Sequence, residues 1–137
     1  MNSSTNITGN LTRDPELKFL QNGTATARFT VAVSEKWTDR SGQAKEQTSF
    51  FDCDAIGDIA KNIADSLRKG DRVVVAGNFK QRSWDTPDGD KRSVIELKVE
   101  SVGPDLRFAV ATVQRTAHSI PERQGANADW HPHEDAF

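Results

Sequence analysis

The stretch that decides the fold runs from Leu67 to Trp84 and reads LRKGDRVVVAGNFKQRSW. A helical pattern ends at Gly70, because glycine can adopt the left-handed conformation that terminates a helix. The apolar residues that follow alternate, which predicts a strand with one inward face. Its other face ends in Lys80, Arg82 and Trp84, two residues apart. Cations attract phosphate and an indole stacks on a base, so this face suits a single nucleic-acid strand. A half-buried strand with a solvated edge explains the pattern equally well.

Three strands are predicted before this stretch. Asn6–Leu11 is short and contains a glycine, which often marks a bulge or a close approach of backbones. Ala25–Ser34 and Thr48–Ile56 alternate in polarity, as strands with one buried face do. Between them, Glu35–Gln47 is predicted to be a polar loop that holds Trp37, either as a lid on the core or as a contact residue.

One helix and one further strand complete the pattern. Apolar residues at helical spacing from Ile59 to Leu67 predict a helix with Asp58 as its N-cap. Lys91–Val102 is predicted to be the return strand of a hairpin, with Ile95 and its alternate neighbours inward. The order of elements is that of an all-β fold, the five-stranded OB-fold Greek-key barrel with one helix between strands 3 and 4. This fold commonly binds oligonucleotides or oligosaccharides, but the fold alone does not establish a function.

Length and charge set further limits. The 137 residues are 35% hydrophobic and carry a net charge of −2, which argues against a globally basic nucleic-acid binder. Acids and cations balance in the predicted domain, residues 1–112, and acids exceed cations in the predicted flexible tail, residues 113–137. A neutral body can still carry a basic stripe, so the total charge neither requires nor excludes a polyanionic partner.

Cys53 is the single cysteine and lies in an apolar strand without a neighbouring histidine, which predicts a buried structural thiol rather than a nucleophile. The N-terminus is polar and no apolar run has the length of a membrane span, so a cytoplasmic protein is expected.

Aromatic side chains and cations alternate along the predicted elements. The stacking candidates are Trp37, Phe50 and Trp84. The cations interleaved with them are Arg28, Lys36, Arg40, Lys45, Arg68, Lys69, Lys80 and Arg82. This combination is what sequence-independent binding of single strands requires. In the alternative interpretation, Phe50 belongs to the core, Trp84 packs within the hairpin and stabilises it, and the cations are solvated surface residues.

The chain resembles the bacterial single-stranded DNA-binding protein family over about residues 5–112. The matching stretches are NITGNLTRDPELKFLQNG, ARFTVAVSEKW, KEQTSFFDC and SLRKGDRVVVAGNFKQRSW. The resemblance implies a homotetramer over which single-stranded DNA is wrapped, with Trp37, Phe50 and Trp84 at stacking positions. It places phosphate-contacting cations at Lys18, Lys36, Lys45, Arg68, Lys69, Lys80 and Arg82. The implied role is sequence-independent binding and protection of single-stranded DNA in replication, recombination and repair, in the nucleoid.

Some residues depart from the family pattern. Ile56 stands where the family commonly has an aromatic residue, so one stacking platform is lost. Asp52 and Asp54 share a strand face with Phe50, where anions oppose phosphate. They either pair with nearby cations such as Arg28 or stay unpaired and weaken binding. Val102–Val113 resembles an extra C-terminal strand by which some members clamp neighbouring subunits.

The tail is short and ends in an acidic and aromatic tip, Glu134, Asp135, Ala136 and Phe137. Such a tip is suited to docking in a hydrophobic, basic pocket of replication and repair proteins, although an inert disordered end is the alternative. His131 and His133 give only a weak metal-binding signal, so neither a metal nor a cofactor is expected.

Three other functions are consistent with parts of the sequence. The first is a specialised OB-fold module of replication restart, recombination or natural transformation, with a small site size and weak partner recruitment. The second is a nuclease or nucleotidyl transferase, but only Asp52 and Asp54 form a pair of strand acids and nothing evidently completes a metal site, so no enzyme is expected. The third is a purely structural oligomer.

Overall fold

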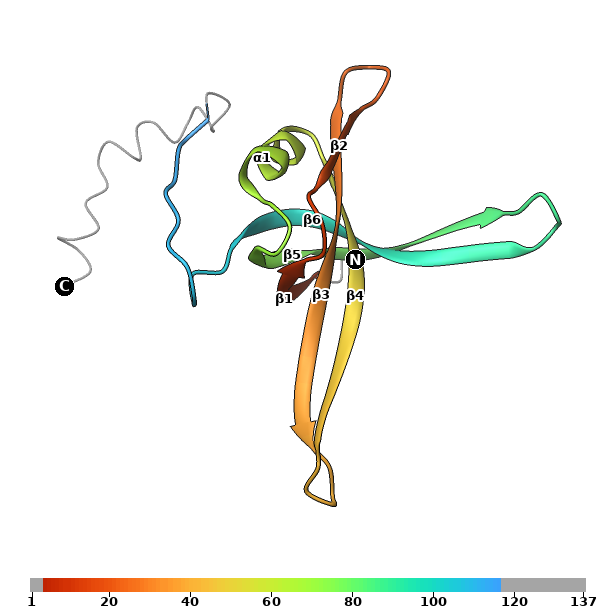
Figure 1. Ribbon diagram of the computed structural model, residues 1–137. Coiled ribbons are helices and arrows are strands. Elements are labelled where there is room, and N and C mark those ends of the chain that lie inside the picture. The colour runs from red at the N-terminus through yellow and green to blue at the C-terminus, as the bar shows by residue number, and fades with distance from the viewer. Residues whose placement is uncertain (1–3, 117–137) are drawn as a thin grey trace.

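The computed structural model describes residues 4–116 and contains six strands and one helix in that range (Figure 1). The elements in chain order are β1 (Ser4–Leu11), β2 (Glu16–Phe19), β3 (Ala25–Thr38), β4 (Ala44–Ile56), α1 (Asp58–Ser66), β5 (Arg72–Asp85) and β6 (Lys91–Pro104).

Five of these strands close into a barrel. β1 is antiparallel to both β3 and β5, which joins the two ends of the sheet. The β3–β4 and β5–β6 pairs are antiparallel hairpins, whereas β4 and β6 run parallel. β2 adds to the outer edge of β3, and α1 follows β4 and precedes β5 in the chain. This topology confirms the OB-fold barrel that the order of elements predicts.

The alternating residues supply the core. Phe29 and Val31 of β3, Val73 and Val75 of β5 and Leu97 of β6 are almost fully buried. α1 adds further buried residues, among them Ile63. Burying such side chains stabilises a fold by about 1.5–3 kcal/mol each. The alternation read from the sequence therefore identified these inward residues of β3, β5 and β6 correctly.

Two glycines are required by close approaches of backbones. A Cβ added at Gly9 would lie 2.2 Å from the carbonyl oxygen of Ala32, and one added at Gly77 would lie 2.0 Å from that of Lys98. Gly77 also lies at the register irregularity between β5 and β6. Of the two alternatives for the glycine of the first strand, a bulge or a close approach of backbones, the structure shows the close approach at Gly9.

Two hairpin arms project from the barrel, one formed by β3 and β4 and the other by β5 and β6 (Figure 1). The loop predicted over Glu35–Gln47 is wrong for most of its length, because β3 continues to Thr38 and β4 begins at Ala44. Only a tight turn remains, in which Asp39 Oδ1 accepts hydrogen bonds from Ser41 and Gln43. Backbone pairing extends these strands through residues that are polar on both faces.

Other boundaries differ from the predicted ones. The N-cap of α1 is Gly57 rather than Asp58, and the helix ends at Ser66, with Leu67 as its C-cap. Gly70 has a φ of 89°, but it belongs to the turn after the helix. Ile95 is 64% exposed rather than inward, because it lies on the β5–β6 arm beyond the core.

The separate strand predicted over Val102–Val113 is not formed in the single chain. Its first residues belong to the end of β6, and residues 105–116 form no strand. A strand requires a neighbour along its length for its backbone hydrogen bonds. In the described chain, this segment bonds to another strand only at its start, where the N–H of Asp105 donates to the carbonyl oxygen of Arg72. The expected tail tip, Glu134–Phe137, lies outside the described residues.

Within residues 4–116, no helix has the length and apolar character needed to cross a membrane.

Candidate nucleic-acid interface

The outer face of β5 carries an indole and a guanidinium in contact. Val73 and Val75 point into the core, so Arg82 and Trp84 project from the opposite, exposed face. The guanidinium carbon of Arg82 lies 4.8 Å from the centroid of the Trp84 ring, which is within cation–π range. Trp84 remains 41% exposed. One face of the indole is covered by a cation, and part of the ring stays open to solvent.

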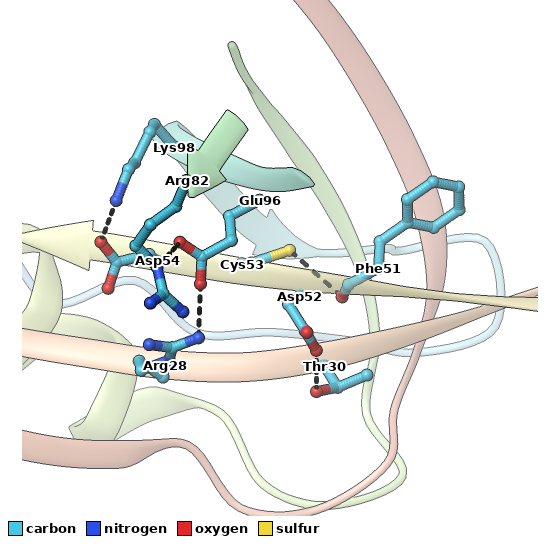
Figure 2. Close-up of polar contacts among 9 residues, drawn as sticks. All are labelled: Arg28, Thr30, Phe51, Asp52, Cys53, Asp54, Arg82, Glu96 and Lys98. Carbon is cyan, nitrogen blue, oxygen red and sulfur yellow. Dashed lines mark hydrogen bonds and ion pairs between the residues drawn. The ribbon is translucent and has the colours of Figure 1, made fainter. Parts of the chain in front are cut away.

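A buried carboxylate joins two of the predicted DNA-binding arginines. Figure 2 shows Glu96 of β6 between Arg28 of β3 and Arg82 of β5. Arg28 Nη2 donates to Glu96 Oε2, and Arg82 Nε donates to Glu96 Oε1 at 3.2 Å. The Glu96 side chain is 3% exposed, whereas the two arginines are 44% and 52% exposed. Each arginine side chain is therefore about half exposed although its partner is buried.

Electrostatics keep Glu96 ionised. Burial alone would raise the pKa of its carboxyl group, but the hydrogen bond from Arg82 and the positive charges of Arg28, Arg82 and Lys98 outweigh that effect. The pKa therefore lies below its ordinary value. Lys80 lies directly opposite Glu96 in the β5–β6 register, which places a further cation on this face.

Asp52 and Asp54 project from the same face of β4 as Phe50, as their alternation predicted. Asp54 Oδ2 accepts a hydrogen bond from Lys98 Nζ at 2.7 Å, and Asp52 Oδ1 accepts one from Thr30 at 2.9 Å (Figure 2). Pairing is therefore confirmed for Asp54, with Lys98 as its partner instead of Arg28.

The three aromatic candidates do not form one cluster. Phe50 is 65% exposed and lies opposite Ala32, whereas Trp37 is 46% exposed and lies opposite Lys45. Residues 32 and 37 differ by an odd number in an unbroken strand register, so Phe50 and Trp37 lie on opposite faces of the β3–β4 arm. The exposure of Phe50 excludes its assignment to the core. Ile56 is 57% exposed on the Phe50 face.

The remaining predicted cations are spread over the surface. Lys18, Lys36 and Lys45 lie 3.5–3.9 Å from Glu16, Glu46 and Asp39, respectively, in exposed pairs that contribute little to stability. Arg40, Lys69 and Lys80 are exposed. Arg68 is committed to the end of α1, because its Nη1 donates to the carbonyl oxygens of Ala64 and Leu67.

Sequence reasoning missed Glu96 and Lys98. They alternate with the core residue Leu97 on β6, so the sequence could have predicted their position on the outer face. Their partners, however, lie on strands distant in sequence.

Cys53 is buried, as predicted. Burial, and to a lesser extent the nearby charge of Asp52, raises the pKa of its thiol to about 12. In the described part of the chain, no three metal-ligating side chains are grouped to hold a metal ion.

Comparison with known proteins gives consistent matches. The family model described as "Single-strand binding protein family" matches residues 2–105. The single-stranded DNA-binding protein of Mycolicibacterium smegmatis is 45% identical over 115 residues, which cover 82% of this chain and 70% of that protein. The protein of the same name from Paenarthrobacter aurescens is 46% identical over 122 residues, 88% of this chain and 70% of that protein. A chain of the structure titled "Plasmodium falciparum SSB complex with ssDNA" superimposes with a TM-score of 0.70 at 26% identity, covering 76% of this chain and 94% of that one.

Proposed function

Because this chain belongs to the single-strand binding protein family, as its sequence resemblance implies, we propose that it binds single-stranded DNA without reading base sequence. The binding form is a homotetramer over which the strand is wrapped. Its role is to cover and protect single strands in replication, recombination and repair, in the nucleoid of the cytoplasm, and it catalyses no reaction.

The observation that carries this proposal is the contact between Trp84 and Arg82 on an exposed strand face. A base needs a flat apolar surface, and its phosphate needs a cation within reach of the same nucleotide. Trp84 and Arg82 supply both at a separation of 4.8 Å. Arg28 is tied to the same carboxylate as Arg82, which adds a second cation to this face.

The other predicted contact residues extend the path. Phe50 gives a second exposed ring on the outer face of the β3–β4 arm, where Lys36 also lies. On the opposite face of this arm, Trp37 with Lys45 contacts a separate part of the DNA strand. Lys18, Arg40, Lys69 and Lys80 contact phosphates as exposed cations. For Arg68, whose guanidinium caps α1, we propose at most a contact through its remaining N–H groups. Glu134–Phe137 docks to replication and repair proteins.

The test is a titration of the full chain with dT oligomers of increasing length, with Trp130 first changed to Phe so that only Trp37 and Trp84 report. Trp84→Ala should weaken binding by roughly 1–3 kcal/mol per stacked base. Ile95→Ala is the matched control, because Ile95 is 64% exposed on the opposite face of the same hairpin. Its affinity should equal that of the parent.

Salt dependence tests the phosphate contacts. The logarithm of the binding constant should fall with the logarithm of salt concentration, with a slope of about −0.7 per phosphate neutralised. Duplex DNA of equal length should compete poorly. Absence of binding to long dT, or equal losses for Trp84→Ala and Ile95→Ala, would overturn the proposal. If one tetramer covers only a small number of nucleotides, the protein is instead the specialised OB-fold module.

A further inference from the structure

Glu96 is the only charged residue that is fully buried within residues 4–116. Removing a carboxylate from water is costly unless cations and hydrogen-bond donors compensate for the lost hydration. Glu96 meets this condition, because each of its two oxygens accepts a hydrogen bond from a different arginine. It lies on β6, between the strands that carry Arg28 and Arg82.

This arrangement restricts both guanidinium groups. A free arginine on a surface has many rotamers, and ordering it on phosphate binding costs entropy. Arg82 is held by its Nε atom and by the ring of Trp84, and Arg28 is held by Nη2. Their other N–H groups are not used by Glu96. Both side chains remain about half exposed, so a ligand can reach them.

We propose that Glu96 is a positioning residue of the DNA-binding face. It holds Arg28 and Arg82 side by side, so that a phosphate meets two oriented guanidinium groups. By fixing Arg82 on one face of Trp84, it leaves the other face of the indole for a base. This inference rests on the proposed function and adds to it a residue that does not itself touch DNA.

Simple electrostatics predicts the opposite effect on binding. A negative charge near a phosphate path repels DNA, so its removal should tighten binding. A positioning role predicts that removing the same charge weakens binding, because both arginines lose their orientation. Glu96→Gln separates the two, since glutamine has nearly the same shape but lacks the charge.

The experiment measures dT binding by Trp fluorescence for the parent, Glu96→Gln and Glu46→Gln, all with Trp130→Phe. Glu46 is the matched control, because it is exposed and lies 3.9 Å from Lys36 on the β3–β4 arm. Glu96→Gln should weaken binding by about tenfold, the value of one charge-assisted hydrogen bond lost from the complex. Glu46→Gln should bind as tightly as the parent or more tightly.

A second comparison uses Arg82→Ala with and without Glu96→Gln. If Glu96 acts through Arg82, its substitution should cost less affinity once Arg82 is already alanine. Urea unfolding of each variant shows whether the protein titrated is folded. If Glu96→Gln does not fold, Glu96→Asp replaces it, because it keeps the charge and withdraws the carboxylate by one methylene. Glu96→Asp should then weaken binding without changing the salt slope.

The inference is overturned if Glu96→Gln, or Glu96→Asp in its place, binds dT as tightly as the parent or more tightly. It is also overturned if the loss from Glu96→Gln is the same with Arg82 present and absent, because Glu96 would then act on the fold in general. Failure of the parent itself to bind dT would contradict the proposed function instead.

Discussion

Replacing Asp54 with Asn should destabilise the protein, whereas the same change at Asp52 should not. The two residues project from the same face of β4, but their surroundings differ. Asp54 Oδ2 lies 2.7 Å from Lys98 Nζ, with side chains that are 13% and 36% exposed, respectively. Asp52 is exposed and accepts a hydrogen bond only from the neutral hydroxyl of Thr30 among described residues.

The size of the effect follows from these contacts. A hydrogen bond to a charged group contributes about 1.5–3 kcal/mol, and a neutral one about 0.5–1.5 kcal/mol. Both aspartates make hydrogen bonds of the first kind, and Asn keeps an acceptor at both positions. Only Asp54→Asn also removes an attraction between opposite charges, that of the carboxylate and the ammonium group of Lys98. Because Lys98 is about one-third exposed and partly screened, we expect a loss of about 1 kcal/mol. At Asp52, solvent screens the lost charge and the amide oxygen of Asn can still accept from Thr30, so we expect a change within about 0.5 kcal/mol.

The assay is urea unfolding followed by circular dichroism, at one fixed protein concentration because association affects apparent stability. A repeat at about 1 M salt, where the Debye length is about 3 Å, should leave most of the Asp54 effect in place. Binding of dT gives a second readout, in which Asp52→Asn should tighten binding at low salt, with a smaller gain as salt rises. Equal losses of stability in both variants, or a larger loss at Asp52, would refute the reasoning.

Three further outcomes are expected. Gly77→Ala should markedly lower the melting temperature, because its Cβ would lie 2.0 Å from the carbonyl oxygen of Lys98, whereas Gly103→Ala, with no atom within 4 Å of its Cβ, should not. The Cys53 thiol, buried and with a pKa of about 12, should resist iodoacetamide in the native protein at mildly alkaline pH and react after unfolding in urea. The pKa of Glu96 is depressed by folding, so its ionic stabilisation is fully present above the ordinary value of 4.5 and is lost as pH falls through the lower folded value. The difference in unfolding free energy between the parent and Glu96→Gln should therefore shrink below about pH 4.5 in acid titrations.

The barrel was predictable because its strands alternate in polarity. Burial of Phe29 and Cys53, and exposure of Phe50 and Trp84, follow from a period of two once a strand has one face against a core. The two hairpin arms were harder to predict. Beyond the barrel neither face is buried, so the residues around Trp37 lack a hydrophobic pattern and read as a loop, although backbone pairing continues through them.

The contacts at the candidate site were predictable only in part. The outward position of Arg82 follows from local alternation, but its bond to Glu96 depends on the hairpin register. The bond between Arg28 and Glu96 joins residues 68 positions apart, so it required the closed barrel. The segment after Pro104 has the alternating pattern of a strand but forms none in the described residues. Alternation of side chains does not show whether a neighbouring strand is present to accept and donate the backbone hydrogen bonds.

These contacts change how the charge of the DNA-binding face should be counted. More than half of the cations predicted to contact phosphate have an acidic partner within 4 Å in the described chain. The exposed pairs can separate at little cost, so their lysines remain available to DNA. The two arginines on Glu96 differ, because separating them from a buried carboxylate would leave that charge uncompensated. Phosphate must therefore bind to the N–H groups that Glu96 does not use, and the arginines and Glu96 together present one net positive charge rather than two. The strength of phosphate binding at this point then depends on the orientation of Arg28 and Arg82 and on the adjacent Trp84 ring more than on the number of cations.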